Sequence, residues 1–431
     1  MWDPLRALIL KLPPSLRPVV PILGGCLCLV PFGTIYTSGN IQPYIVSYMR
    51  HYVDPSLDNS KMVWLFSLQL TFPPLGVTLG GLIEAKLGTR IASLIGGMIM
   101  WVGVYLSYFA VQHSYPLLLV TFGMMFGLGQ TIAITQPMIN AIRWLPSRKG
   151  LATGIVVAGT GLGGLVFSPV QTKFVNPLNL EFDRNGYFSQ PSVLNKVPSM
   201  FLLLATCYML IQVLGSLVLV DPFEDEEKLT LLPKKSEFKL KTLLKSSSFW
   251  WLFLTFTFNT PVVTMTSSFY KSFGQTFIGD DLFLATVLSV SSVVNTAGRL
   301  FWGWFADLTS YQIAMCSASS LQCVLMLTFG ACQKAGKTMY LIWVCGLYMG
   351  FSSNFTLIPL ATTKCFGQEL FAVNYGFVSL SVSFCAYVIA AVADALLESI
   401  GYGGIWFICA AMVFCTFLLT ATIHKTDRGR E

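Results

Sequence analysis

The chain has 431 residues, of which 54% are hydrophobic and only 11% are charged. Ordinary soluble proteins carry roughly 25% charged residues. This deficit excludes a soluble protein and indicates an integral membrane protein. The formal net charge of +7 does not point to nucleic acid, because most Lys and Arg residues lie in short segments between apolar runs.

Twelve apolar runs are long enough to cross a membrane, which takes about 20 residues as a helix. Their approximate ranges are 20–46, 62–84, 90–111, 115–140, 150–171, 199–220, 248–271, 282–306, 311–332, 338–361, 370–394 and 403–423. We therefore predict an all-α membrane protein with twelve transmembrane helices. Residues 1–220 would form an N-terminal half of six helices, 221–248 a charged cytosolic linker, and 249–431 a C-terminal half of six helices.

The basic residues between the runs predict the orientation of the chain. With the N-terminus inside, the inner segments hold 18 Lys and Arg residues and the outer segments hold 8, among them Lys271 after the seventh run. Because cytosolic loops carry an excess of positive charge, both termini are expected in the cytosol. The expected location is the plasma membrane, with an organelle membrane as the alternative.

Two sequence marks recur at the same spacing in the two halves. Gly81 and Gly303 lie at the ends of the second and eighth runs, 222 positions apart, and Gly154 and Gly376 in the fifth and eleventh runs have the same offset. This agreement indicates a duplicated six-helix unit and hence two pseudo-symmetric halves, as parallel repeats give in transporters. The residues expected to serve conformational change are Gly81, Gly88, Arg90, Gly303, Asp307, Gly154 and Gly159.

The eighth run contains Arg299, a residue that is costly at membrane depth by about 2.5–3.5 kcal/mol on insertion scales. On a helix, Ser292, Asn295 and Thr296 share a face with it. This polar stripe is typical of a helix that lines a cavity. The alternative is that Arg299 lies near a helix end, reaches the headgroups, or pairs with Asp307.

Arg299 is the one strong charge that the sequence places at depth, and the carboxylates lie near the ends of the runs. An unpaired buried cation needs a counter-ion, which a substrate can supply. The eleven cysteines and three histidines are scattered through separate runs, linkers and a tail, so we expect no metal, cofactor or catalytic cluster and hence no enzyme.

Together these features resemble the major facilitator superfamily. Within it, Trp144 to Gly164 (WLPSRKGLATGIVVAGTGLGG) closely resembles the signature of the oxalate:formate antiporter family. Asn295 to Asp307 (NTAGRLFWGWFAD) resembles the same family and, more distantly, the monocarboxylate transporters. The resemblance implies that Arg299 binds a substrate carboxylate.

Three departures from these families qualify that implication. Val382 stands where the oxalate carriers have a second basic residue, which favours a monoanion over a dianion. Asn295 stands where monocarboxylate transporters have an aspartate, which puts their style of proton coupling in doubt. Ala85 replaces the usual loop aspartate, so we expect a weaker charge lock in the first half, with Asp307 keeping it in the second.

We therefore predict a secondary active transporter of small organic anions by alternating access, with lactate, pyruvate or formate as examples. Its expected partners are that anion, the lipid bilayer, and protons or a counter-anion, with no nucleic acid. The alternatives are a transporter of amino acids or other zwitterionic or neutral solutes, and a non-transporting membrane sensor or scaffold. The residues expected to bind substrate are Arg299, Asn295, Tyr36, Asn40, Gln136, Asn259, Tyr348 and Tyr375.

Overall fold

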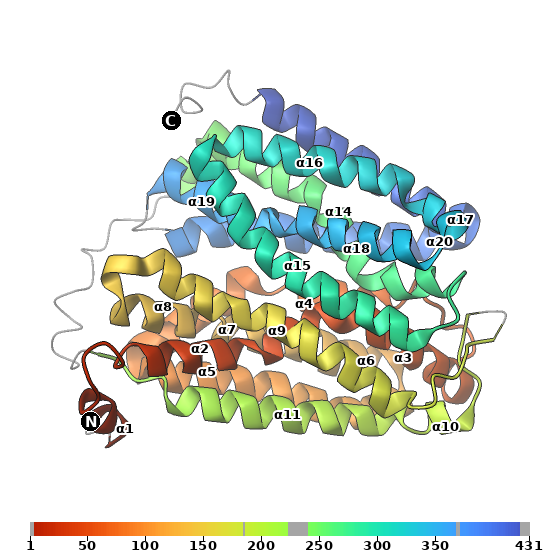
Figure 1. Cartoon of the computed structure of the whole chain (residues 1–431), viewed down its shortest axis with the longest axis horizontal. Coiled ribbons are helices and arrows are strands. Elements are labelled where there is room, and N and C mark those ends of the chain that lie inside the picture. Colours follow the sequence, from red (N-terminus) through yellow and green to blue (C-terminus); the bar gives the residue numbers. More distant parts are fainter. Residues whose placement is uncertain (1–3, 184–185, 223–239, 368–370, 423–431) are drawn as a thin grey trace.

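A computed structural model describes residues 4–183, 186–222, 240–367 and 371–422. Within these ranges the ordered elements are all helices, and no strand is present, so the predicted all-α class is confirmed. Figure 1 shows elongated helices packed side by side, with α2 to α11 in one layer and α14 to α20 in the other. We call the end of the bundle that carries α1 and α8 the near end, and the end that carries α10 and α17 the far end.

The first half begins with short α1 and continues into long helical runs. The first run joins two helices through a 3-10 segment at residues 31–37, and the fourth contains a π-helical stretch at 119–125. The helices are α1 (Pro4–Leu10), α2 (Val19–Leu29), α3 (Ser38–Tyr52), α4 (Val63–Gln69), α5 (Pro73–His113), α6 (Tyr115–Leu118), α7 (Phe126–Ala133), α8 (Thr135–Trp144), α9 (Lys149–Val175), α10 (Pro191–Leu194) and α11 (Val197–Leu217).

The second half follows the same plan after the central linker. Its helices are α13 (Leu240–Lys245), α14 (Ser247–Gln275), α15 (Asp281–Leu308), α16 (Tyr311–Thr328), α17 (Cys332–Ala335), α18 (Lys337–Ser352), α19 (Asn354–Phe366) and α20 (Phe371–Thr422). Capping side chains fix where two of these helices begin. Asp280 and Ser310 cap α15 and α16 by accepting from the N–H groups of Phe283 and Ile313.

In the described ranges, nine helical stretches are long and apolar enough to cross a membrane. Two of them each contain one glycine with positive φ, Gly88 at 84° and Gly401 at 63°. Because glycine adopts this conformation without a Cβ clash, each position turns the chain and divides one stretch into two spans. With α14, which is 29 residues long, the helical stretches match the twelve predicted runs.

The buried apolar residues form separate cores in the two halves. One core runs from Ile22 to Leu219. The second half has two cores, which are built from residues 243–413. Val63 is the one fully buried residue that the first half contributes to them. The halves are therefore packed internally, and what joins them is a seam between helices.

The described contacts across that seam extend from the middle of the bundle to the far end. Helix α15 leaves the second layer at the near end and comes to lie against α9 at the far end. Ser168 on α9 donates to the carbonyl of Ala285, and Ser289 donates to the carbonyl of Leu165. Toward the near end, a Cβ added at Gly154 would meet no other described part of the chain within 4 Å, and one added at Gly376 would meet only Pro74 among the described residues. The bundle is closed at the far end.

Candidate functional site

Arg299 lies on α15, nine residues before the helix ends, and its side chain is half-buried. Its Nη2 atom donates to the Tyr36 hydroxyl across the seam at 2.8 Å. Its Nε atom is buried and has no hydrogen-bond partner among the described residues. No ion pair within 4.0 Å joins Arg299 to a described carboxylate, including that of Asp307. The guanidinium thus keeps donors available for an anion.

Aromatic rings flank the guanidinium. The Cζ atom of Arg299 lies 5.2 Å from the ring centre of Phe355 and 5.9 Å from that of Tyr36. The Tyr36 ring in turn stacks on Phe351 with 6.3 Å between ring centres. Cation–π attraction at these distances holds the arginine without neutralising its charge.

Three further predicted residues lie around this centre. Asn295 donates through Nδ2 to the carbonyl of Tyr348 at 3.0 Å, which ties α15 to α18. The hydroxyl of Tyr348 is buried and lies beside the Ser267 side chain. Tyr375 on α20 lies close enough to interact electrostatically with Arg299 and Tyr36. Tyr36, Asn295 and Tyr375 therefore lie next to Arg299, and Tyr348 lies beside Tyr36 and Asn295.

The other three predicted residues lie elsewhere and have their own partners. Asn259 donates to the side chain of Asn354 at 2.8 Å within the second half. Gln136 donates to the carbonyl of Ile132 at 3.2 Å and packs against Gly80 within the first half. Asn40 belongs to a polar cluster at the far end. In this conformation the structure brings none of them to Arg299.

The glycines of the repeated motifs fall into two groups. Gly159 lies in a tight crossing of α9 over α2, where an added Cβ would lie 2.1 Å from the carbonyl oxygen of Cys26. Gly81 and Gly154 have no neighbour within 4 Å of such an atom, and Gly303 has the Thr356 methyl at 3.4 Å. Close packing thus explains Gly159 but not Gly81 or Gly154.

The ion pairs that were expected to connect the loop motifs to neighbouring helices differ from the sequence expectation. Arg143 at the end of α8 pairs with Glu84 at 2.9 Å and with Asp221 at 3.0 Å. Glu84 precedes Ala85 directly, so a neighbouring acid supplies the charge that Ala85 lacks. In the second half, Asp307 is exposed, and no ion pair connects it to another residue in the described ranges.

Arg299 is not the only basic residue that the helices enclose. Lys271, which we counted in an outer loop, is fully buried near the end of α14 and forms an ion pair with fully buried Asp281 at 2.7 Å. They are the only charged side chains among the described residues that are buried. The sequence did hold a signal, because Asp280 alone suffices to cap α15 and leaves the adjacent Asp281 for another role.

Two cavities lie at the far end and neither touches Arg299. One, of about 310 Å³, is lined by Tyr48, Tyr52, Tyr108, Gln112, Asn195, Pro198 and Ser199. The other, of about 180 Å³, lies beside the turn at Gly401. The Arg299 side chain is itself partly exposed.

Comparisons with known proteins agree with this architecture. The model of the Major Facilitator Superfamily matches residues 27–391. Apicoplast pyruvate carrier 1 of Toxoplasma gondii is 28% identical, with 94% of this chain and 90% of the relative covered. The oxalate:formate antiporter of Oxalobacter formigenes is 23% identical, with 81% and 79% covered. The crystal structure of a D-xylose–proton symporter superposes with a TM-score of 0.71 at 12% identity, covering 94% of this chain and 96% of the symporter.

Proposed function

Because the chain belongs to the major facilitator superfamily and is a multi-pass membrane transporter, not an enzyme, we propose that it carries small monocarboxylates such as pyruvate, lactate or formate. The observation that carries the proposal is the Arg299 guanidinium, which has a buried, unpartnered Nε and no carboxylate partner among the described residues. A substrate carboxylate would accept two parallel hydrogen bonds from the forked guanidinium of Arg299.

The surroundings of Arg299 favour a small monoanion. Phe355 and the Tyr36 ring present apolar faces, while Asn295 and the Tyr348 hydroxyl supply polar edges. Val382, at the position of the second cation in the oxalate carriers, is buried among apolar side chains. A second carboxylate would therefore lack a partner there. The amino group of a zwitterion would likewise find no described carboxylate beside Arg299.

The distribution of basic residues indicates which side of the membrane the open end of the bundle faces. We propose that the near end faces the cytosol, together with both termini, so that this conformation is open inward. The burial of Lys271 removes one of the eight outer charges and strengthens the inner excess. A tag at each terminus, tested for protease access in intact and permeabilised cells, checks this orientation, and tagged protein imaged in cells separates plasma membrane from organelle.

Uptake into proteoliposomes tests the substrate. We expect saturable uptake of labelled pyruvate, lactate or formate that unlabelled monocarboxylates inhibit and amino acids or oxalate do not. Uptake that rises as the outer pH falls indicates proton symport, whereas uptake that requires an internal anion indicates exchange. Inhibition by amino acids alone would favour the zwitterion alternative.

The matched variants are Arg299→Gln and Arg50→Gln. Arg50 is an arginine at the far end whose guanidinium donates to the carbonyl of Leu57. Hydrogen bonds to charged groups are worth about 1.5–3 kcal/mol each, so Arg299→Gln is expected to lower kcat/KM by about 100-fold. Arg50→Gln should leave it unchanged. Unaltered saturable uptake by Arg299→Gln would contradict the proposal.

A further inference from the structure

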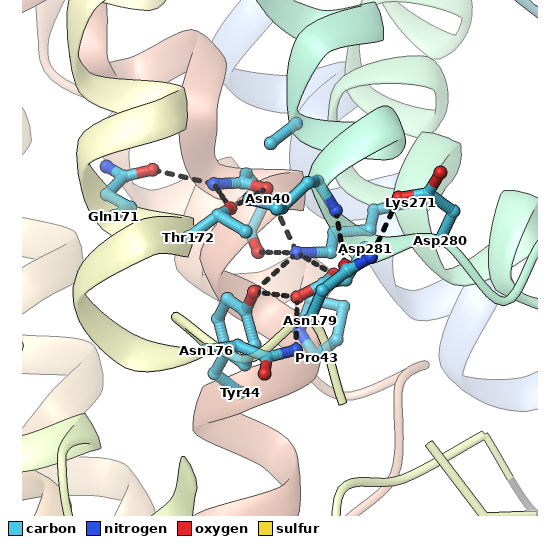
Figure 2. Close-up of polar contacts among 12 residues, drawn as sticks. Asn40, Pro43, Tyr44, Gln171, Thr172, Asn176, Asn179, Lys271, Asp280 and Asp281 are labelled. Atoms are coloured by element: carbon cyan, nitrogen blue, oxygen red, sulfur yellow. Dashed lines mark hydrogen bonds and ion pairs between the residues drawn. The ribbon is translucent and has the colours of Figure 1, made fainter. Parts of the chain in front are cut away.

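A second charged cluster lies at the far end of the bundle, away from Arg299. Lys271 comes from the last turns of α14, and Asp281 is the first residue of α15, so both belong to the second half. Their side chains are 0% exposed and the Nζ–Oδ1 distance is 2.7 Å. Figure 2 shows the two side chains converging where α3, the end of α9 and these two helices meet.

The first half supplies neutral partners to this pair. Lys271 Nζ donates to the Asn40 carbonyl at 3.2 Å, to its Oδ1 at 3.0 Å, and to the Tyr44 hydroxyl at 3.0 Å. The Tyr44 hydroxyl donates to Asp281, and Asn176 Nδ2 donates to the same carboxylate at 2.9 Å. The ammonium also lies 4.1 Å from the Tyr44 ring centre. Every neutral side chain bound to the pair thus comes from across the seam.

Those neutral partners are themselves held by the first half. Asn40 Nδ2 donates to the Ser168 carbonyl, to Gln171 Oε1 and to Thr172 Oγ1, all on α9 and all at 3.1 Å. Figure 2 shows Asn40 between Gln171 and Thr172 on one side and Lys271 on the other. Contacts within the first half alone therefore hold the Asn40 side chain in position.

A second link lies beside the first. Asn179 donates to Asp280 at 3.1 Å and accepts from the Leu282 N–H at 2.9 Å. Asp280 lies outside α15. Burial alone would raise the pKa of its carboxyl, but hydrogen bonds from the Phe283 N–H, Lys337 and Asn179 hold that pKa below its usual range. Asp280 therefore stays ionised at ordinary pH and accepts the hydrogen bond from Asn179 as a carboxylate.

The division of charge between the halves determines what opening would cost. A buried ion pair repays its desolvation only with good geometry and further hydrogen bonds, which the first half provides here. When the halves part at this end, the pair stays together in the second half and water can replace Asn40, Tyr44 and Asn176. Opening would therefore break hydrogen bonds between neutral side chains and the ion pair, without separating opposite charges.

We propose that Asn40, Tyr44 and Asn176 of the first half and the Lys271–Asp281 pair of the second form the gate that closes the far end. This inference rests on the alternating access of the proposed transporter, but it does not depend on the substrate. The competing explanation is an ion pair that merely fastens α14 to α15. That explanation requires nothing from α3.

Thiol labelling of purified protein in nanodiscs tests the gate. The probe is Ser267→Cys in a background without the eleven native cysteines, labelled by a hydrophilic maleimide. Ser267 lies on α14, one turn before Lys271. It is fully buried, and its hydroxyl lies beside that of Tyr348 within the second half, so the probe removes no contact across the seam. Labelling reports opening toward water and needs no ligand.

The test variant is Tyr44→Phe and its matched control is Tyr340→Phe. Tyr340 is equally buried, and its hydroxyl donates to the carbonyl of Tyr270 within the second half. Tyr44→Phe removes two hydrogen bonds to charged groups across the seam, so we expect the labelling rate to rise at least about tenfold. Tyr340→Phe should stay within about twofold of the parent, since it removes nothing across the seam.

Equal labelling of Tyr44→Phe and its parent, or an equal rise in Tyr340→Phe, would overturn the gate. If Tyr44→Phe gives no monodisperse protein, Asn176→Ala removes the other donor to Asp281 and carries the same expectation. Increased labelling without monocarboxylate uptake would leave the gate standing and reject the substrate. Monocarboxylate uptake without increased labelling would support the substrate and reject the gate.

Discussion

Arg299 and Lys271 are two basic residues on neighbouring helices, and they have opposite surroundings. Lys271 is fully buried, with Asp281 at 2.7 Å and neutral acceptors around it. Arg299 is half-buried, with a hydroxyl, two aromatic rings and no described carboxylate. The difference teaches that burial alone does not identify a substrate-binding cation. We propose that the absence of a resident acid among its described neighbours marks Arg299 as the cation for the substrate.

The largest expected difference between the two sites is in stability. Asp281→Asn leaves Lys271 buried without its acid, which typically costs about 3–5 kcal/mol. Arg299→Gln removes a charge that has no described acid, so it should cost little or nothing. Thermal unfolding in detergent should rank Asp281→Asn well below Arg299→Gln, and Lys271→Met with Asp281→Asn should recover most of the loss. Wild-type stability in Asp281→Asn alone would show that the pair is not required.

Changing the shape of the cation at Arg299 should have the next largest effect. Arg299→Lys keeps the charge but loses the planar fork that grips a carboxylate through two parallel bonds. We expect kcat/KM for pyruvate uptake to fall about tenfold, equivalent to about 1.4 kcal/mol. Full activity in this variant would indicate that charge alone binds the substrate.

The Tyr36 hydroxyl offers a finer test of the same site. Tyr36→Phe keeps the ring over the guanidinium but removes its 2.8 Å hydrogen bond. One such bond contributes about 0.5–1.5 kcal/mol, so we expect KM to change by about 2–10-fold. Tyr105→Phe, which loses a hydroxyl contact to Thr206 within the first half, is the control and should leave KM unchanged.

The smallest effects are expected at Asn259 and Gln136, which are bonded away from Arg299. Asn259→Ala breaks the contact to Asn354, and Gln136→Leu removes one to the Ile132 carbonyl. We expect KM to stay within about twofold in both, measured by initial rates of uptake, because neither loses a contact to the site. A rise as large as that of Tyr36→Phe would place either residue on the substrate path in another conformation.

Periodicity and composition were enough to predict the fold. Apolar runs give the helices, and glycine marks the turns at residues 88 and 401 that divide the two longest stretches. Arg299 was identifiable because a charge inside an apolar helix is conspicuous. Tyr36 was found among polar residues in the first run, although its distance from Arg299 depends on how two distant helices cross.

The Lys271–Asp281 pair could not be predicted as easily. Each residue lies near the end of an apolar run, where a charge ordinarily meets headgroups or water. Tertiary packing instead extends α14 to Gln275 and buries both ends under α3. Likewise, nothing in the local sequence shows that Asn40 belongs with this pair and not with Arg299, because long-range packing decides it.

Ligand-induced stabilisation tests most directly the claim that Arg299 is the cation left for the substrate. The measurement is the unfolding temperature of purified protein as pyruvate is added, since a bound ligand stabilises in proportion to its occupancy. Wild type and the variant with Lys271→Met and Asp281→Asn should both be stabilised, and Arg299→Gln should not. Equal stabilisation of Arg299→Gln and wild type would contradict the account.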